Sequence, residues 1–157
     1  MAQLRPILLV EDSLNDIELT LAALERSRLA NPVQVARDGV EALDFLFRLG
    51  NAPDSMPGPL PVVILLDIKL PRVDGLEVLE RIRAEPRTRQ VPVVMLTSSR
   101  EEQDLVRSYG LGVNAFVVKP VGHREFFEAI RDIGAFWAVL NEPPPTHSGS
   151  PESGAAE

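Results

Sequence analysis

Short apolar runs alternate with longer helical stripes along most of the chain. Segments with the length of strands lie at 6–10, 33–37, 62–66, 91–96 and 115–118. Helical spacing of apolar residues predicts helices at 13–28, 38–49, 76–84, 100–110 and 123–140. Strands that alternate with helices in this way specify an α/β three-layer fold. Short right-handed crossovers favour a doubly wound parallel sheet of five strands in the order 2-1-3-4-5.

The predicted helices differ in how much apolar surface they can bury. The stripe of the first helix begins at Leu14 and continues through Ile17 and Leu24, so we expect this face to pack on the sheet. The fourth helix is polar and has Leu105 and Val106 as its main apolar contacts. Because tertiary packing supplies most helical stability, we expect the fourth helix to be the least firmly held.

Two stretches do not fit the alternation. Residues 51–61 hold four prolines, which predicts an irregular loop. We expect a tolerated surface insertion there, with a binding loop as the alternative. Residues 141–157 are rich in Pro, Ser, Gly and Glu and are predicted to be disordered, because they cannot bury a core. The predicted organisation is one domain over 1–140 and a tail over 141–157.

Composition narrows the classes of function. The chain has 157 residues, enough for one domain with a proper core. It has no Cys, which excludes disulfides and thiolate chemistry and fits a reducing compartment, so we expect a cytoplasmic protein. No segment has the pattern of a signal peptide or approaches the roughly 20 apolar residues of a membrane span. The net charge of −7, with scattered basic residues, makes nucleic acid an unfavourable partner.

Polar residues follow four of the predicted strands directly. Glu11 and Asp12 end the first, Asp67 ends the third, Thr97 the fourth and Lys119 the fifth. Ligands bind at the carboxyl edge of a parallel sheet, because the crossovers leave a crevice there. A lone Asp after a strand more often caps the next element. The convergence of several such residues on one edge favours a functional site instead.

The carboxylates at this edge predict a metal site. Glu11, Asp12 and Asp67 would repel one another unless a cation lay among them. Oxygen ligands without Cys point to Mg²⁺, or to Mn²⁺ in its place. With Lys119 and Thr97 on its other side, Asp67 would be a nucleophile toward phosphorus, because these groups neutralise charge in the transition state.

These residues, with their neighbours, resemble the receiver domain of two-component response regulators. The matching features, in the family's order, are Glu11 and Asp12, Asp67 after VVILL, LPRVDG at 70–75, Thr97 in MLTSS and Lys119 in FVVKP. They span residues 5–140. Each motif alone is weak, but all of them in order at strand ends are very specific. The resemblance implies a flavodoxin-like three-layer sandwich that takes part in two-component signalling.

The resemblance also implies roles for the acidic residues. It implies that Asp67 accepts a phosphoryl group from the phosphohistidine of a sensor histidine kinase and later loses it slowly. It implies Mg²⁺ held by Asp12, Asp67 and the backbone carbonyl of Lys69. Glu11 stands where the family often has a second Asp, and its implied contribution to the metal is through a water.

Further resemblances concern the rest of the pocket and the partner. By resemblance, Lys119 and Thr97 contact the phosphoryl group, and the peptide bond between Lys119 and Pro120 is cis. The 51–61 loop, the MLTSS motif and the FW pair at 136–137 are similar, more narrowly, to the small single-domain regulators paired with bacterial phytochromes. A bacteriophytochrome kinase is therefore the expected partner.

Two hypotheses concern how the signal leaves the site. Phosphorylation would draw Thr97 inward and let Phe116, in the family's switch position, fill the vacated space, which changes the face of the fourth helix, fifth strand and fifth helix. Plain core packing of Phe116 is the alternative. The fifth helix is longer than a strand can cover, so its apolar end, with Phe136 and Trp137, is predicted to overhang the sheet and form a homodimer. The alternative is that this end folds back onto the core.

Other readings of the pocket are less favoured. A haloacid-type phosphatase needs a second Asp two residues after its nucleophile, where this chain has Lys69. A flavodoxin-like nucleotide binder would need its glycine motif between a strand and a helix. A receiver-like module that binds partners without phosphate is the main alternative, although such a module would normally have lost pocket residues.

Overall fold

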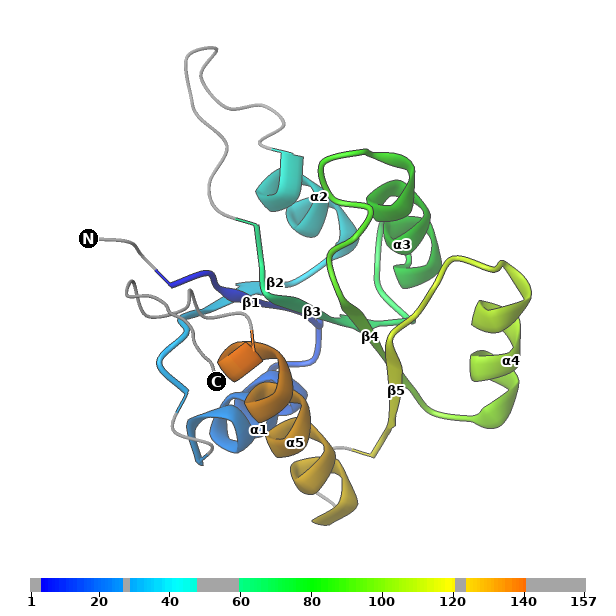
Figure 1. Ribbon diagram of the computed structural model, residues 1–157. Coiled ribbons are helices and arrows are strands. Elements are labelled where there is room, and N and C mark those ends of the chain that lie inside the picture. The colour runs from blue at the N-terminus through cyan, green and yellow to red at the C-terminus, as the bar shows by residue number, and fades with distance from the viewer. Residues whose placement is uncertain (1–3, 27–28, 48–59, 121–123, 141–157) are drawn as a thin grey trace, which may run out of the picture.

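The computed structural model describes residues 4–26, 29–47, 60–120 and 124–140. Its strands form one parallel sheet in the order β2-β1-β3-β4-β5, as predicted (Figure 1). The strands are β1 (Ile7–Val10), β2 (Val33–Ala36), β3 (Val63–Asp67), β4 (Val93–Thr97) and β5 (Ala115–Val118). The helices are α1 (Leu14–Arg26), α2 (Gly39–Phe47), α3 (Gly75–Ala84), α4 (Arg100–Ser108) and α5 (Arg124–Leu140). Most of the predicted 51–61 loop and the predicted tail at 141–157 lie outside the described residues.

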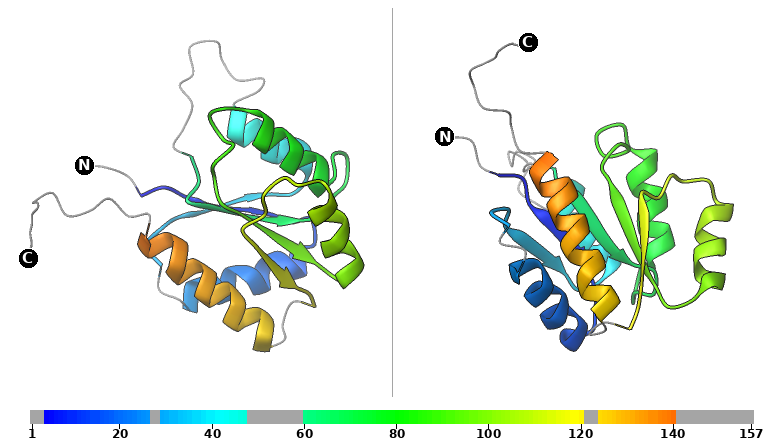
Figure 2. Two further views of the ribbon diagram at one scale, coloured as in Figure 1. Left: turned by 45° about the vertical axis from the view of Figure 1, so that its right-hand side comes forward. Right: turned by 60° about the horizontal axis from the view of Figure 1, so that its bottom comes forward.

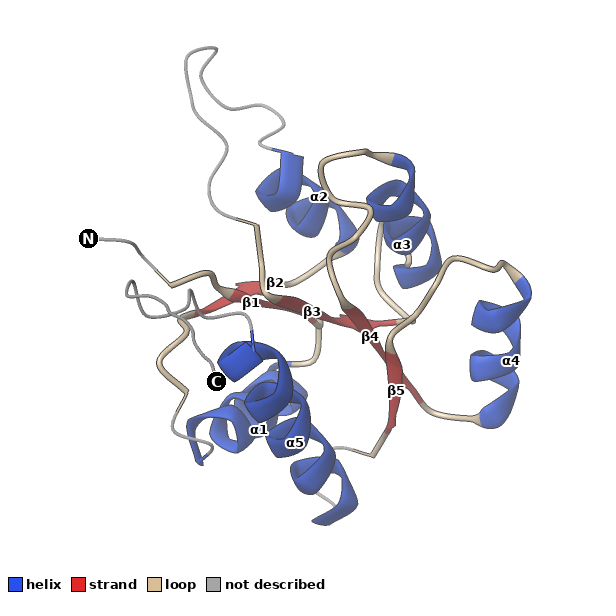
Figure 3. Cartoon of the chain, viewed as in Figure 1, coloured by secondary structure: helices blue, strands red, loops and turns tan. Residues whose placement is uncertain are grey.

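Helices cover both faces of the sheet, so the molecule has three layers (Figures 2 and 3). Successive residues of a strand point to opposite faces. On β1, Leu8 and Val10 therefore belong to the core cluster that includes residues of α2 and α3 and Val106 of α4, whereas Ile7 and Leu9 belong to the cluster that includes residues of α1 and α5. Because β1, β3 and β4 are buried on both faces, only their carboxyl ends can present polar groups to a ligand.

Two apolar residues expected in the core are exposed, and those predictions are wrong. Leu14 is 60% exposed, because the buried face of α1 begins one turn later, at Ile17. Leu105 is 48% exposed, and Val106 is the buried residue of α4. A nine-residue helix at the side of the sheet presents only one position to the core, so α4 is anchored even less than its pattern predicts.

Close packing fixes the segment between β3 and α3. A Cβ atom on Gly75 would collide with the carbonyl oxygen of Asp67, and one on Gly39 would collide with that of Val73. Arg72, in the same segment, has a φ of 70°, and its guanidinium donates to the Asp38 carboxylate at 3.3 Å. The turn after Asp67 is therefore fixed by close backbone packing at Gly39 and Gly75 and by the contact of Arg72 with Asp38. None of the described helices has the length and apolar character needed to cross a membrane.

Candidate functional site

Three carboxylates gather at the carboxyl edge of the sheet, as predicted. Val10 pairs with Leu66 across β1 and β3, which places Glu11 beside Asp67. One oxygen from each of Glu11, Asp12 and Asp67 lies within 4.8 Å of the others. Glu11 and Asp67 are buried, whereas Asp12 is exposed, so the group opens to solvent on one side. We call these three residues the acidic cluster.

The Lys119 side chain reaches the acidic cluster from the end of β5. Its Nζ lies 2.8 Å from Glu11 Oε1 and 3.0 Å from Asp67 Oδ2. A third carboxylate, Asp16 in the first turn of α1, is 3.2 Å away. The Lys119 side chain is only 15% exposed, so these interactions are weakly screened by water. The peptide bond from Lys119 to Pro120 is cis, in agreement with the expectation from sequence.

Burial and charge alter the acid–base behaviour of this pocket. Burial raises the pKa of Glu11 to about 7, against the opposing effect of its hydrogen bond from Lys119, and the charge of Asp67 adds to the rise. Burial alone would lower the pKa of Lys119, but its hydrogen bond to Glu11 and the charge of Asp67 outweigh it and raise that pKa. Lys119 is therefore an ammonium at neutral pH. This single positive charge faces three carboxyl groups, those of Glu11, Asp16 and Asp67.

Thr97 and Lys69 connect the pocket to α4. Thr97 is fully buried at the end of β4, directly after Leu96, which pairs with Asp67. The Gln103 side-chain amide donates to Thr97 Oγ1 at 3.4 Å. The backbone N–H of Lys69 donates to Asp67 Oδ1 at 3.3 Å, and its ammonium lies 3.2 Å from Glu102 Oε2. The first turn of α4 therefore touches residues on both sides of Asp67.

Phe116, the expected switch residue, and Phe136, an expected dimer residue, lie on different elements, β5 and α5. Phe116 is half-buried on β5, and the Arg107 guanidinium of α4 lies 4.6 Å from its ring centroid. Phe136 packs edge-on against Trp137 with ring centroids 5.0 Å apart. Phe136 is 56% exposed, whereas Trp137 packs against the core and Gly134 is buried against Leu29. Of the described side chains in the predicted overhang, only Phe136 is strongly exposed.

Three polar residues of the site, Asp16, Glu102 and Gln103, are not among those that the sequence predicts. Asp16 carried a usable signal, because an acid in the first turn of the helix after β1 must lie at the same edge of the sheet. Glu102 and Gln103 carried none, since their contacts depend on how α4 sits beside β4. From the sequence alone, both are polar residues of a helix that is mostly polar.

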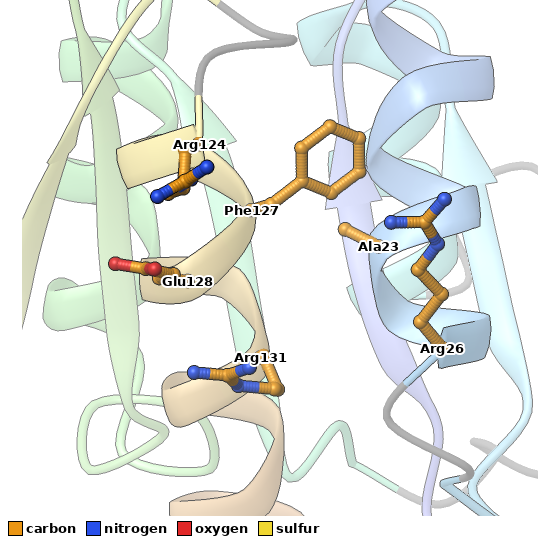
Figure 4. A pocket seen from close by; sticks show the side chains of 6 residues that line it. All are labelled: Ala23, Arg26, Arg124, Phe127, Glu128 and Arg131. Atoms are coloured by element: carbon orange, nitrogen blue, oxygen red, sulfur yellow. The ribbon is translucent and has the colours of Figure 1, made fainter.

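A separate hollow of about 330 Å³ lies between α1 and α5 (Figure 4). Its lining residues are Ala23, Arg26, Arg124, Phe127, Glu128 and Arg131. The Arg26 guanidinium lies 5.5 Å from the Phe127 ring centroid. None of the predicted site residues lines this hollow, so it is distinct from the acidic cluster.

The residues matched by one family model settle what kind of domain this is. The model for the response regulator receiver domain matches residues 7–131. The chain belongs to this family. The match covers every strand and the first half of α5, and it includes each residue of the acidic cluster together with Thr97 and Lys119. The family predicted from the motifs is thereby confirmed, and so is the receiver fold.

Three similar proteins match this receiver domain over most of their own length. The response regulator Rcp1 of Synechocystis sp. is 40% identical over 131 residues, which cover 83% of this chain and 87% of Rcp1. The solved structure of the bacteriophytochrome response regulator AtBRR is 64% identical, covers 90% of this chain and 100% of its own, and has a TM-score of 0.72. The phosphorylated cyanobacterial phytochrome response regulator RcpA is 36% identical, covers 92% and 100%, and has a TM-score of 0.75.

The acidic cluster of this receiver domain suits a hard divalent cation. Its donors are all carboxylate oxygens, and Mg²⁺ and Mn²⁺ prefer such ligands. The exposed side at Asp12 leaves room for waters or a phosphoryl oxygen. The excess of carboxylates over the one ammonium also favours added positive charge. On the chemistry of its donors, the pocket fits the metal that the family implies.

Proposed function

We propose that Asp67 accepts a phosphoryl group from the phosphohistidine of a sensor histidine kinase, within one receiver domain over 1–140. The observation that carries this proposal is the contact of Lys119 Nζ with both Asp67 Oδ2 and Glu11 Oε1, at 3.0 and 2.8 Å. It brings an ammonium from the end of β5 to a carboxylate at the end of β3, in a pocket that also holds Glu11, Asp12 and Asp16. Membership of the receiver family supports the same assignment.

In the proposed step, a carboxylate oxygen of Asp67 attacks the phosphorus of the donor. A new O–P bond forms an acyl phosphate, and the N–P bond to the donor imidazole breaks with its electron pair on nitrogen. Lys119 neutralises charge on the equatorial oxygens, and the Thr97 hydroxyl donates to one of them. Water later hydrolyses the acyl phosphate slowly.

We assign the metal to Glu11, Asp12, Asp67 and the backbone carbonyl of Lys69, with Glu11 acting through a water. Mg²⁺, or Mn²⁺ in its place, would supply charge neutralisation at the phosphoryl oxygens when bound. A structure of the relative Rcp1 was solved in its Mn²⁺-bound form, which supports this choice of ion.

One experiment tests the phosphoacceptor directly. The protein is incubated with Mg²⁺ and a small acyl phosphate, and its intact mass is measured. We expect the wild type to gain one phosphoryl group, the exposed-residue control Glu80→Gln to do the same, and Asp67→Asn to gain none. If the wild type stays unmodified, the receiver is better described as a phosphate-independent interaction module.

We assign the output to the face formed by α4, β5 and α5. Phosphorylation would turn Thr97 away from Gln103, and Phe116 would leave its place beneath Arg107 to fill the space. The Phe116→Ala variant should still accept phosphate but lose the phosphate-induced amide shifts of this face in NMR spectra. Full retention of those shifts would remove Phe116 from the pathway.

The exposed Leu14 supports a docking surface for the kinase beside the pocket. It is 60% exposed at the start of α1, two residues after Asp12. Similarity to AtBRR points to a bacteriophytochrome as the kinase. We expect Leu14→Glu to slow phosphotransfer from such a kinase while phosphorylation by a small acyl phosphate stays at the wild-type rate. An equal loss with both donors would place Leu14 in the pocket chemistry instead.

A homodimer through the end of α5 remains our proposal for assembly. Phe136 is 56% exposed beside Trp137, and a large exposed aromatic side chain favours a partner. The Phe136→Glu variant should lower the sedimentation coefficient to that of a monomer. An unchanged coefficient would exclude Phe136 from the interface. We also propose that the protein acts in the cytoplasm, without nucleic acid or a membrane as a direct partner.

A further inference from the structure

Asp16 is the one carboxylate on Lys119 that lies outside the acidic cluster, among the residues that the structure describes. Lys119 Nζ has three N–H donors, and its three carboxylate partners are Glu11 at 2.8 Å, Asp67 at 3.0 Å and Asp16 at 3.2 Å. Glu11 and Asp67 belong to the acidic cluster, but Asp16 does not. The ammonium therefore joins the proposed metal ligands to a residue of α1.

A divalent cation and the Lys119 ammonium would both be attracted by the negative charge of Glu11 and Asp67. A cation in the acidic cluster would take up the charge of Glu11 and Asp67 and would repel an ammonium a few ångströms away. The phosphoryl transfer proposed above would use both positive charges at Asp67. The chain must therefore hold Lys119 close to the pocket after the cation has taken two of its three partners.

Asp16 is placed to do this. Its backbone N–H donates to Ser13 Oγ at 3.2 Å, which fixes the first turn of α1. Its side chain is 23% exposed and that of Lys119 is 15% exposed, so their interaction is partly shielded from water. The carboxylate approaches the ammonium from α1, whereas the cluster residues lie at the ends of β1 and β3.

We infer that Asp16 is a positioning residue that retains the Lys119 ammonium at the edge of the pocket while a divalent cation occupies the acidic cluster. This inference rests on the proposed metal site. It predicts that the cation and the lysine bind together more easily with Asp16 than without it. Without Asp16, the ammonium would depend on Glu11 and Asp67 alone and would compete more strongly with the metal.

The test measures the dissociation constant of Mn²⁺ by isothermal titration calorimetry on the full chain. We expect Asp16→Asn to weaken Mn²⁺ binding about fivefold, the order of one partly shielded ion pair. The conservative variant Asp16→Glu should retain most of the affinity, because its carboxylate can still reach Lys119. The control Glu18→Gln removes an exposed carboxylate of α1 and should change the constant less than about twofold, as expected of a screened surface charge.

A double-mutant cycle separates positioning from a general effect of charge. In a Lys119→Met background, Asp16→Asn should weaken Mn²⁺ binding no more than Glu18→Gln does. An equal effect of Asp16→Asn with and without Lys119 would overturn the positioning role and leave the metal site standing. If the wild type binds no Mn²⁺, the proposed metal site and this inference both fail. Circular dichroism of each variant reports whether the fold is retained.

Discussion

Helices α3 and α4 are neighbours in the chain and similar in length, yet they are attached to the sheet in opposite ways. On α3, Val78, Leu79 and Ile82 are all fully buried. On α4, Val106 is the only buried residue. Local capping does not account for the difference, because Asp74 and Ser99 each accept a hydrogen bond from a backbone N–H in the first turn of their helix.

Helix α4 has few apolar contacts with the core, but it makes polar contacts with residues around Asp67. Glu102 pairs with Lys69, Gln103 donates to Thr97, and Arg107 lies over a residue of β5. We expect two of these partners, Thr97 and Phe116, to change their contacts when Asp67 is phosphorylated, and the third, Lys69, lies two residues after Asp67. We therefore expect the position of α4 to depend on the state of the pocket and that of α3 to depend on the core.

The largest expected effect on the free energy of unfolding comes from truncating one leucine side chain to alanine, with the matched change on the other helix as the comparison. Leu79→Ala on α3 removes a fully buried side chain and should cost about 2–5 kcal/mol of unfolding free energy. The matched change Leu105→Ala on α4, at a residue 48% exposed, should cost less than about 0.5 kcal/mol. Urea unfolding of the two variants measures both values. Similar losses would show that α4 is anchored by packing after all.

The same contrast separates what the sequence could predict from what it could not. The strand order and the convergence of Asp67 and Lys119 follow from apolar runs and from which residue ends each run. The exposure of Leu14 and Leu105 cannot be predicted in this way. Helical periodicity identifies the apolar face of a helix, but not how much of that face the sheet covers. The contacts of Gln103 depend on how α4 is rotated about its axis. Because α4 has a single buried residue, Val106, the apolar pattern of the sequence does not define that rotation.

A second prediction concerns Arg83, which connects the end of α3 to the segments before β4 and β5. Its guanidinium donates to the carbonyl oxygens of Leu111, Val91 and Gly112, each at 2.8 Å. Arg83→Met would leave these acceptors without their donor and should cost about 2 kcal/mol. Arg83→Lys should recover only part of this loss, because an ammonium lacks the planar fork of donors. Thermal unfolding compares the two variants, and equal stability of both with the wild type would contradict the assigned role.

A smaller effect is expected where α4 meets β5. Arg107→Ala removes the guanidinium 4.6 Å above the Phe116 ring and should cost about 0.5–1 kcal/mol in the unphosphorylated protein. If Phe116 moves inward on phosphorylation, the loss should shrink in the phosphorylated protein. Chemical unfolding of both states tests this, with Arg100→Ala at the exposed start of the same helix as the control. An equal loss in both states would mean that the ring stays in place.

The smallest effect concerns the ion pair between Lys69 and Glu102, whose side chains are 79% and 14% exposed. Glu102→Gln removes only the charge, because its amide oxygen can still accept the hydrogen bond from the Ser98 N–H. A double-mutant cycle with Lys69→Met should give a coupling of about 0.5 kcal/mol, as expected of an ion pair whose ammonium is largely exposed to water.

That coupling should fall toward zero at about 1 M salt, where screening is nearly complete. Loss of the ion pair in Glu102→Gln should speed hydrogen exchange in the amides of α4 and leave that of the α3 amides unchanged. The reason is that we expect only α4 to depend on the pocket for its attachment. Asp104→Asn, which breaks a more exposed pair 3.8 Å long on the same helix, is the control. Faster exchange in both helices would mean that the pair stabilises the whole domain and that α4 is not separately controlled.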